Sequence, residues 1–254
     1  MNHVSNNLEP DLPLTAWNWR DVIIISAGAI TAFLAGALLL YFLANYFQPM
    51  EPQSGEPSIL LSAGLAGLEG IALIGAVYLL GLRRCNLDWS SVGLRPLPRI
   101  WLVNSVLLAL IVIPLAGLVA LIIQLALGRP LENPQVPFLA PGGFSWFGLI
   151  SMFFLGGIVA PFAEELFFRG VLYRWLRGRW GIWVGILGSS LIFGAVHGEV
   201  SIAGAAAVLG LILAWVYERS QSLWPPFIIH AINNSAKIIL LYAMLASGEA
   251  IPGL

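Results

Sequence analysis

Charged side chains are scarce in this chain. Asp, Glu, Lys and Arg make up 10% of the 254 residues, while 59% of the residues are hydrophobic. Soluble domains carry about 25% charged residues. The shortage excludes an ordinary soluble domain, so we expect an integral membrane protein surrounded by membrane lipid, with no nucleic-acid partner.

Cysteine and histidine are also rare, with one Cys and three His in the sequence. Cys85 alone can form neither an intrachain disulfide nor a cysteine-based metal cluster. The sequence lacks His-Glu-x-x-His, the helical motif of many zinc peptidases. No Ser-His-Asp triad is evident, because Ser189 and Ser190 have no suitable acidic residue nearby in the sequence.

Long apolar runs fill most of the chain. A helix needs about 20 residues to cross a hydrocarbon core of about 30 Å. The sequence predicts seven spans, of which the fifth and sixth are short, at residues 22–47, 59–82, 100–127, 146–169, 182–197, 202–217 and 226–245. We therefore expect an all-α membrane protein, a polytopic bundle of about seven transmembrane helices.

Arginine gathers in alternate connections between these spans. Only Arg129 lies in the other set of connections. By the positive-inside rule, the N-terminus is predicted to be cytoplasmic and the C-terminus outside. We expect the plasma membrane for a chain of this size with a short tail and no organelle signal. The first run is too long for a signal-peptide core and follows Glu9 and Asp11, so we expect a retained span. The clustered arginines are Arg20, Arg83, Arg84, Arg95, Arg99, Arg174, Arg177, Arg179 and Arg219.

The ionisable side chains within the spans are concentrated in the second half. Residues 1–21 are predicted to be a polar N-terminal tail, residues 22–145 three scaffold spans, and residues 146–254 the working core. Glu69 is an exception in the second span. It is expected either to form a buried hydrogen bond or to belong to a cavity.

Two adjacent carboxylates, Glu164 and Glu165, interrupt an apolar run. An ionisable group at membrane depth costs about 2.5–3.5 kcal/mol even on lenient scales, so it indicates function by default. Glu165 and Arg169 are four residues apart and can pair on one helix face. Glu164 is rotated by about 100° from Glu165 and is predicted to be free for chemistry. Pro161, one turn upstream, is expected to kink or loosen the helix.

Two histidines fall in the apolar runs that follow. Phe193 and His197 share a helix stripe, as do His230 and Asn234. We expect these side chains to converge with Glu164 in a cavity open to the cytoplasm. A carboxylate at low dielectric can act as a general base towards water, with an imidazole to help it. Amide and imidazole N–H groups can stabilise the oxyanion of a tetrahedral intermediate, so the set fits amide hydrolysis.

Three ordered motifs resemble a known family. They are Glu-Glu-x-x-x-Arg at 164–169, Phe-x-x-x-His at 193–197 and His-Ala-x-x-Asn at 230–234. They are similar to those of the CPBP intramembrane endopeptidases, which include CAAX prenyl endopeptidases and Abi bacteriocin-immunity proteins. The resemblance covers roughly residues 150–245 and makes 146–254 a catalytic core of the CPBP/Abi type.

The resemblance also implies roles for individual residues. Glu164 would be the catalytic carboxylate, with His197 positioning the water and His230 with Asn234 forming the oxyanion hole. Glu165 and Arg169 would support the site, although a purely structural ion pair is the other interpretation of these two. Phe193 is expected to pack and to orient His197. Asn234 could instead only join helices, a common use of Asn in membranes.

The expected function is an intramembrane endopeptidase for a membrane-associated protein or peptide, which in the CAAX branch is prenylated. No cofactor is favoured. One alternative is a zinc metallopeptidase that binds the metal with Glu164, His197 and His230. Another is a non-catalytic bacteriocin-immunity or binding protein. A proton-coupled transporter ranks last, because the sequence shows no inverted repeat.

Overall fold

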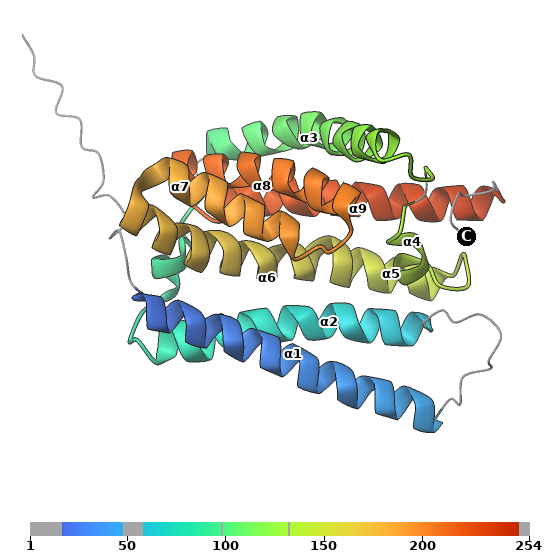
Figure 1. The fold of residues 1–254 in the computed structure, drawn as a ribbon, viewed down its shortest axis with the longest axis horizontal. Helices are drawn as coiled ribbons and strands as arrows, with labels where there is room; N and C mark the ends of the chain where they lie inside the picture. Colours follow the sequence, from blue (N-terminus) through green and yellow to red (C-terminus); the bar gives the residue numbers. More distant parts are fainter. Residues whose placement is uncertain (1–16, 48–57, 98, 132, 249–254) are drawn as a thin grey trace, which may run out of the picture.

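The computed structural model describes residues 17–47, 58–97, 99–131 and 133–248, and these form helices joined by short connections (Figure 1). The predicted all-α polytopic fold is confirmed, since no strand occurs in the described parts. Most of the predicted tail (1–16) and most of the loop after the first span (48–57) lie outside the described residues. The main helices are α1 (Trp19–Phe47), α2 (Ile59–Ala76), α3 (Arg99–Ala126), α5 (Trp146–Phe154), α6 (Ala160–Phe167), α7 (Arg174–Ala195), α8 (Val200–Ser220) and α9 (Trp224–Ser247).

Several shorter helical pieces complete the path. A four-residue helix, α4 (Val136–Leu139), lies in the connection between α3 and α5, and a 3-10 turn spans Trp89–Val92. Three segments are π-helical: Val77–Arg83 extends α2, while Leu155–Val159 and Phe168–Tyr173 flank α6. π-Turns inside α-helices are often found at functional sites. Two of the three surround the helix that carries both adjacent glutamates.

By length and composition, the described chain contains six candidate membrane spans, and the fourth is a run of 50 residues, Trp146–Ala195. This run is two antiparallel segments, because Gly181 has φ 85° and ψ 175°, a conformation that only glycine adopts readily. After the turn, Gly185 packs back against Tyr173 and Arg177. The fold-back gives the seven segments that the sequence predicts, with a short fifth one.

The predicted tail ends earlier than residue 21. Trp17 is buried, its indole Nε1 donates to the carbonyl oxygen of Gly81 at 3.4 Å, and Asp21 pairs with Arg84. Residues 17–21 therefore pack on the end of the second span, and α1 begins three residues before the predicted start at 22.

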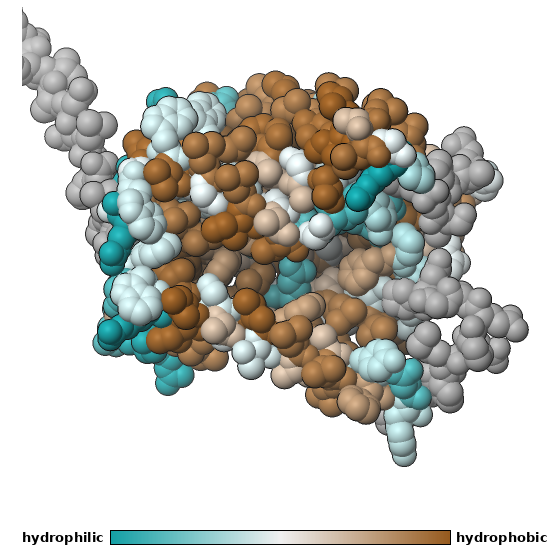
Figure 2. All heavy atoms as spheres, in the orientation of Figure 1, coloured by the Kyte–Doolittle hydropathy of each residue, from teal (hydrophilic) through white to brown (hydrophobic). Residues whose placement is uncertain are grey.

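The bundle is arranged in layers. In Figure 1, α1 and α2 lie side by side, α6 lies over α2, and α7, α8 and α9 follow, with α3 on the far side. The α5–α6 path runs between the α1/α2 pair and the remaining helices, so it lies in the middle of the molecule. Large apolar side chains such as Ile30, Leu38 and Phe42 are exposed, and brown hydrophobic atoms cover much of the face in Figure 2. Such a surface requires lipid around it.

Candidate active site

Pro161 opens the helix just before the adjacent glutamates. Proline has no amide hydrogen, so the carbonyl groups of the preceding turn lose a partner. The helix widens into the π-segment Leu155–Val159 at this point. Asn234 Nδ2 donates to the Gly156 carbonyl at 3.4 Å, and Ser235 Oγ donates to the Gly157 carbonyl at 3.3 Å. The loosened helix that Pro161 predicts is present, and side chains of α9 satisfy the freed carbonyls.

Glu165 is held by its neighbours through one of its two carboxylate oxygens, since its buried Oε2 has no hydrogen-bond partner among the described residues. Its Oε1 lies 3.0 Å from Arg169 Nη1 and 2.9 Å from His230 Nδ1, and all three side chains are buried. Arg169 Nη2 also donates to the Gly210 carbonyl of α8 at 3.1 Å. The pair expected from the spacing of residues 165 and 169 therefore exists. It also connects α6 to α8 and α9, which the sequence did not reveal.

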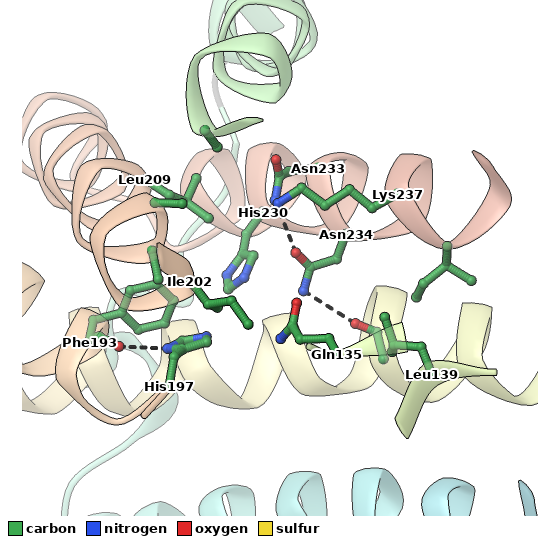
Figure 3. Close-up of a pocket in the computed structure, with 15 residues that line it drawn as sticks. Gln135, Leu139, Phe193, His197, Ile202, Leu209, His230, Asn233, Asn234 and Lys237 are labelled. Atoms are coloured by element: carbon green, nitrogen blue, oxygen red, sulfur yellow. Dashed lines mark hydrogen bonds between the residues drawn. The ribbon is translucent and has the colours of Figure 1, made fainter. Parts of the chain in front are cut away.

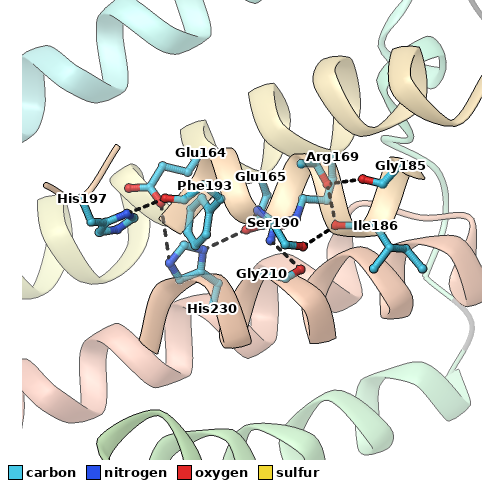
Figure 4. Close-up of polar contacts among 11 residues, drawn as sticks. Glu164, Glu165, Arg169, Gly185, Ile186, Ser190, Phe193, His197, Gly210 and His230 are labelled. Atoms are coloured by element: carbon cyan, nitrogen blue, oxygen red, sulfur yellow. Dashed lines mark hydrogen bonds and ion pairs between the residues drawn. The ribbon is translucent and has the colours of Figure 1, made fainter. Parts of the chain in front are cut away.

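Glu164 differs from Glu165 although the two are neighbours in the chain (Figure 4). Its Oε2 lies 3.7 Å from His230 Nε2, too far for a direct hydrogen bond. This buried oxygen has no hydrogen-bond partner among the described residues. A buried carboxylate oxygen without a donor is costly to keep. Glu165 Oε2 also lacks a partner, but Oε1 of Glu165 is bound by two side chains, whereas Glu164 has just the 3.7 Å contact with His230 among the described residues. This difference fits the expected division between a tied and a free carboxylate.

The ring of His197 is fixed by its own helix. Its Nδ1 lies 2.7 Å from the Phe193 carbonyl oxygen, which can only accept a hydrogen bond. Nδ1 therefore carries the proton, and Nε2 of the neutral ring remains an acceptor. Phe193 lies between the two histidines, with its ring centroid 4.9 Å from that of His197 and 5.6 Å from that of His230. Phe193 thus packs as expected and holds both rings.

His230 is constrained in the same way by Glu165. A carboxylate accepts, so Nδ1 of His230 carries a proton and Nε2 faces Glu164. In the neutral ring, Nε2 is then an acceptor. His230 can donate to an oxyanion through Nε2 only as an imidazolium, a condition that the sequence could not reveal.

A cavity of about 110 Å³ lies beside these groups (Figure 3). Its polar walls come from His197 after α7, Gln135 just before α4, and His230 and Asn234 of α9. Glu164 is not among the lining residues and meets the site through His230. The structure therefore gathers Phe193, His197, His230 and Asn234 around one space, with Glu164 adjoining it.

Sequence reasoning missed three polar residues of this cavity. Asn233 lines it and donates from Nδ2 to Asn234 Oδ1 at 3.0 Å. Lys237 and Gln135 line it as well. The helical period could have indicated Asn233 and Lys237, which lie three and seven residues after His230 on the same side of the helix. No sequence signal marks Gln135.

The cavity lies toward the α4 end of the bundle. Gln135 belongs to the connection between α3 and α5, and His197 belongs to the connection between α7 and α8. The arginine pattern predicts that both connections lie outside the cytoplasm. The predicted cytoplasmic N-terminus and the predicted opening to the cytoplasm therefore disagree. His197 stands at the end of the short fifth segment, between α7 and α8.

Glu69 lines a second cavity of about 460 Å³. Ile30 and Phe33 of α1, Leu73 of α2, and Phe167 beside the adjacent glutamates give this cavity mainly apolar walls. Glu69 is close enough to Glu164 to interact with it electrostatically. Of the two expectations for Glu69, the structure therefore supports membership of a cavity.

The connection that carries His197 is held in place by Glu199, the residue just before α8. Glu199 accepts hydrogen bonds from the amides of Ser201 at 2.8 Å and Ile202 at 3.0 Å, and so caps α8. It also pairs with Arg129 Nη1 at 2.7 Å. The hydrogen bond from the Ser201 hydroxyl is the main cause that holds the pKa of Glu199 below its usual value.

The zinc alternative needs three ligands around one point. Within the described ranges, no group of three or more His, Cys, Asp or Glu side chains is arranged to hold a metal ion. Glu164, His197 and His230 therefore do not form such a group in this geometry.

Comparisons with known proteins agree with the three motifs. Residues 146–236 match the family described as "Type II CAAX prenyl endopeptidase Rce1-like". This range contains every predicted site residue, and the match confirms the resemblance. No solved structure matches the chain.

Two relatives are similar to the chain. A Bacillus subtilis (strain 168) protein named "Putative membrane peptidase YdiL" is 27% identical over 228 residues, which are 87% of this chain and 88% of that protein. An Escherichia coli protein named "Uncharacterized 24.3 kDa protein" is 33% identical over 111 residues, 41% of this chain and 51% of its own length.

Proposed function

We propose that this protein is an intramembrane endopeptidase in which Glu164 activates a water molecule. The observation that carries the proposal is the contrast between the two adjacent glutamates. Both carboxylates have one buried oxygen without a donor, but Glu165 is bound through its other oxygen by Arg169 and His230, whereas Glu164 comes no closer than 3.7 Å to His230. The family match and the name of the Bacillus subtilis relative support a peptidase.

The proposed reaction needs no metal. Glu164 takes a proton from water, and the hydroxide attacks the carbonyl carbon of the scissile peptide bond. His197 Nε2 accepts a hydrogen bond from the water and holds it in place. The Asn234 amide and the His230 imidazolium donate to the oxyanion. Glu164 then gives its proton to the leaving amine as the C–N bond breaks, leaving a new carboxylate and a free amine.

The proposed substrate is a membrane-associated protein or peptide, and more narrowly one that carries a prenyl chain. The matched family supports the narrower class. The larger cavity beside Glu69 supports it too, because its walls are mainly apolar and it lies behind the helix of Glu164. A hydrocarbon chain would occupy that cavity while the peptide lies in the polar one.

The main test compares membranes of cells that carry the intact protein or Glu164→Gln at equal abundance. We expect specific peptide termini to disappear in the variant, and these termini name the substrate and the bond. Identical sets of termini, while a cellular phenotype still depends on the protein, would favour the immunity or binding alternative. About one zinc per purified chain, with activity lost on chelation, would favour the metallopeptidase.

A second test decides the side from which substrate enters. We propose a plasma-membrane protein whose substrate reaches the cavity from the α4 end. Cys85, the single cysteine, lies in the connection before α3, at the opposite end. An impermeant thiol reagent applied to intact cells should label either Cys85 or, in a Cys85→Ser background, Gln135→Cys. Labelling of Gln135→Cys would place the entrance outside the cytoplasm, and labelling of Cys85 would place it inside.

A further inference from the structure

The polar cavity is too small for the proposed substrate. It measures about 110 Å³. Pockets that bind small ligands measure about 300–1,000 Å³, and a peptide of several residues is larger than most such ligands. One wall of the cavity therefore has to move before a peptide bond can reach His230 and Asn234.

The walls of this cavity differ in how easily they can move. Three of them belong to α3, α8 and α9, which are long spans packed against one another. Another is the four-residue helix α4, which lies in the connection between α3 and α5 (Figure 1). Gln135, just before α4, and Leu139, its last residue, line the cavity (Figure 3). Movement of α4 would widen the cavity without separating two spans.

A second hollow lies on the other side of α4. Gln135 and Leu139, four residues apart, face the polar cavity. Other residues of the same short segment line a separate outer cavity of about 210 Å³, and these are Asn133, Pro134 and Pro137. The α4 segment is thus a partition with free space behind it, so it can move outward without displacing packed atoms.

The two sides of this partition are fastened unequally. At the inner side, Val136 is buried, and Tyr242 Oη donates to the Leu139 carbonyl oxygen at 3.0 Å. The far wall of the outer cavity is closed by the ion pair of Arg129 and Glu199, whose side chains are 49% and 24% exposed. Ion pairs as exposed as this one are weak. The segment is therefore anchored at α9 and loosely held at the side of Arg129.

Glycines with positive φ stand on both sides of α4. Gly128 has φ 61° and precedes Arg129, while Gly142 and Gly143, with φ 72° and 87°, follow the segment. A Cβ added at any of the three would have no atom of the described residues within 4 Å, so close packing does not explain these glycines. Their backbone freedom suits hinges, which absorb the change in φ and ψ when a loop closes.

We propose that the α4 segment, residues 133–141, is a lid that moves into the outer cavity to admit the peptide and then closes over the site. The inference rests on the proposed peptidase function, because the lid serves catalysis when a peptide enters the polar cavity. The Arg129–Glu199 pair is the latch of the closed state. Glu199 lies two residues after His197, so the closed latch also steadies the connection that carries this histidine.

The kinetic test locks the lid. Pro137→Cys on the lid and Gln124→Cys on α3 line the outer cavity together, and Cys85→Ser removes the native thiol. A short bifunctional thiol reagent that a reductant removes should join them and occupy the space into which the lid moves. We expect cleavage of a membrane-associated peptide to fall at least about tenfold on joining and to return on reduction. Full activity of the completely joined protein would overturn the proposal.

A labelling test does not depend on hydrolysis. Ala116 is buried and lines the polar cavity from α3, so Ala116→Cys in the Cys85→Ser background reports access to that cavity. Arg129→Gln should raise the labelling rate of this thiol by a charged reagent about two- to fivefold, the population change that loss of one exposed ion pair produces. Added salt should raise the rate with Arg129 present and have no effect in Arg129→Gln.

The matched control is Arg84→Gln, which breaks the exposed pair of Arg84 with Asp21 at the opposite end of the bundle. It should leave the labelling rate unchanged. An unchanged rate in Arg129→Gln, or an equal rise in both variants, would refute the lid. If labelling follows the latch but no peptide is cleaved under any condition, the lid stands and the proposed peptidase function fails, so the two failures can be told apart.

Discussion

Two cavities flank the helix that carries Glu164, and they differ in almost every respect. The smaller, of about 110 Å³, is built by α3, α4, α7, α8 and α9 and contains two histidines, amides and Lys237. The larger, of about 460 Å³, is built mainly by α1, α2 and the end of α6, and its charged residue is Glu69. Histidines and amides that can position water line the first cavity, whereas Ser26 and Glu69 are the polar exceptions in the mainly apolar second one. The proposed chemistry and the proposed hydrocarbon binding are therefore divided between the two sides of one helix.

The sharpest test of this division substitutes the two glutamates separately. Glu164→Gln should lower kcat by about 10²–10⁴-fold, the usual contribution of a general base. Glu69→Gln is the same change at a membrane-buried position and should lower kcat by less than about tenfold, because Glu69 lines the other cavity. Equal losses of kcat in the two variants, measured with purified protein in lipid vesicles, would contradict the division of roles between the two cavities.

Two adjacent donors on α9 provide the next contrast. Asn234→Ala should reduce kcat by about 10²–10³-fold, as expected for one oxyanion donor. Ser235→Ala removes only a hydrogen bond to the Gly157 carbonyl and should leave kcat within a few-fold. If both variants lose activity to the same degree, Asn234 only joins helices.

The buried ion pair should matter for folding as much as for chemistry. Arg169→Met leaves Glu165 with one partner instead of two and should cost about 3–5 kcal/mol in unfolding free energy. Arg177→Met breaks a pair with Glu218 whose side chains are partly exposed and should cost clearly less. Thermal unfolding in detergent measures both, and a small loss for Arg169→Met would show that Glu165 tolerates burial without it.

Filling the apolar cavity should affect lipid-bearing substrates alone. Ala72 lines that cavity, and Ala72→Leu would place three more carbon atoms in it. We expect kcat/KM for a prenylated peptide to fall about tenfold, since about two buried CH₂ contacts are lost at about 0.8 kcal/mol each. Unprenylated peptide should be cleaved as before. An equal effect on both peptides would contradict a separate hydrocarbon site.

The smallest expected effect concerns the cap that holds the His197 connection. The folded-state pKa of Glu199 is lowered, so its stabilising contribution is present above the unfolded value of about 4.3 and is lost as the pH falls through the folded value. Glu199→Gln should therefore cost about 1 kcal/mol at pH 7, typical of a lost cap, and nothing at pH 2. A difference in melting temperature that persists at pH 2 would argue against the carboxylate as its cause.

Helix positions could be predicted from the sequence because they depend on runs of apolar residues. The predicted span at 59–82 corresponds to α2 with its π-extension to Arg83, and the span at 226–245 lies within α9. The Glu165–Arg169 pair was also predictable, since residues four apart meet on one helix wherever that helix lies. The start of α1 was misplaced, because Trp17 is buried by a tertiary contact with Gly81.

The sequence by itself determined the class of protein, the number of segments and the residue types that are proposed to carry the chemistry. Only the tertiary structure decided that His230 bonds to Glu165 rather than to Glu164, that Lys237 opens into the polar cavity, and that this cavity lies at the α4 end. The physical reason is the range of the forces involved. Helix formation and i, i+4 pairing depend on neighbours along the chain, whereas the rotation and depth of one helix against another depend on how all of them pack together.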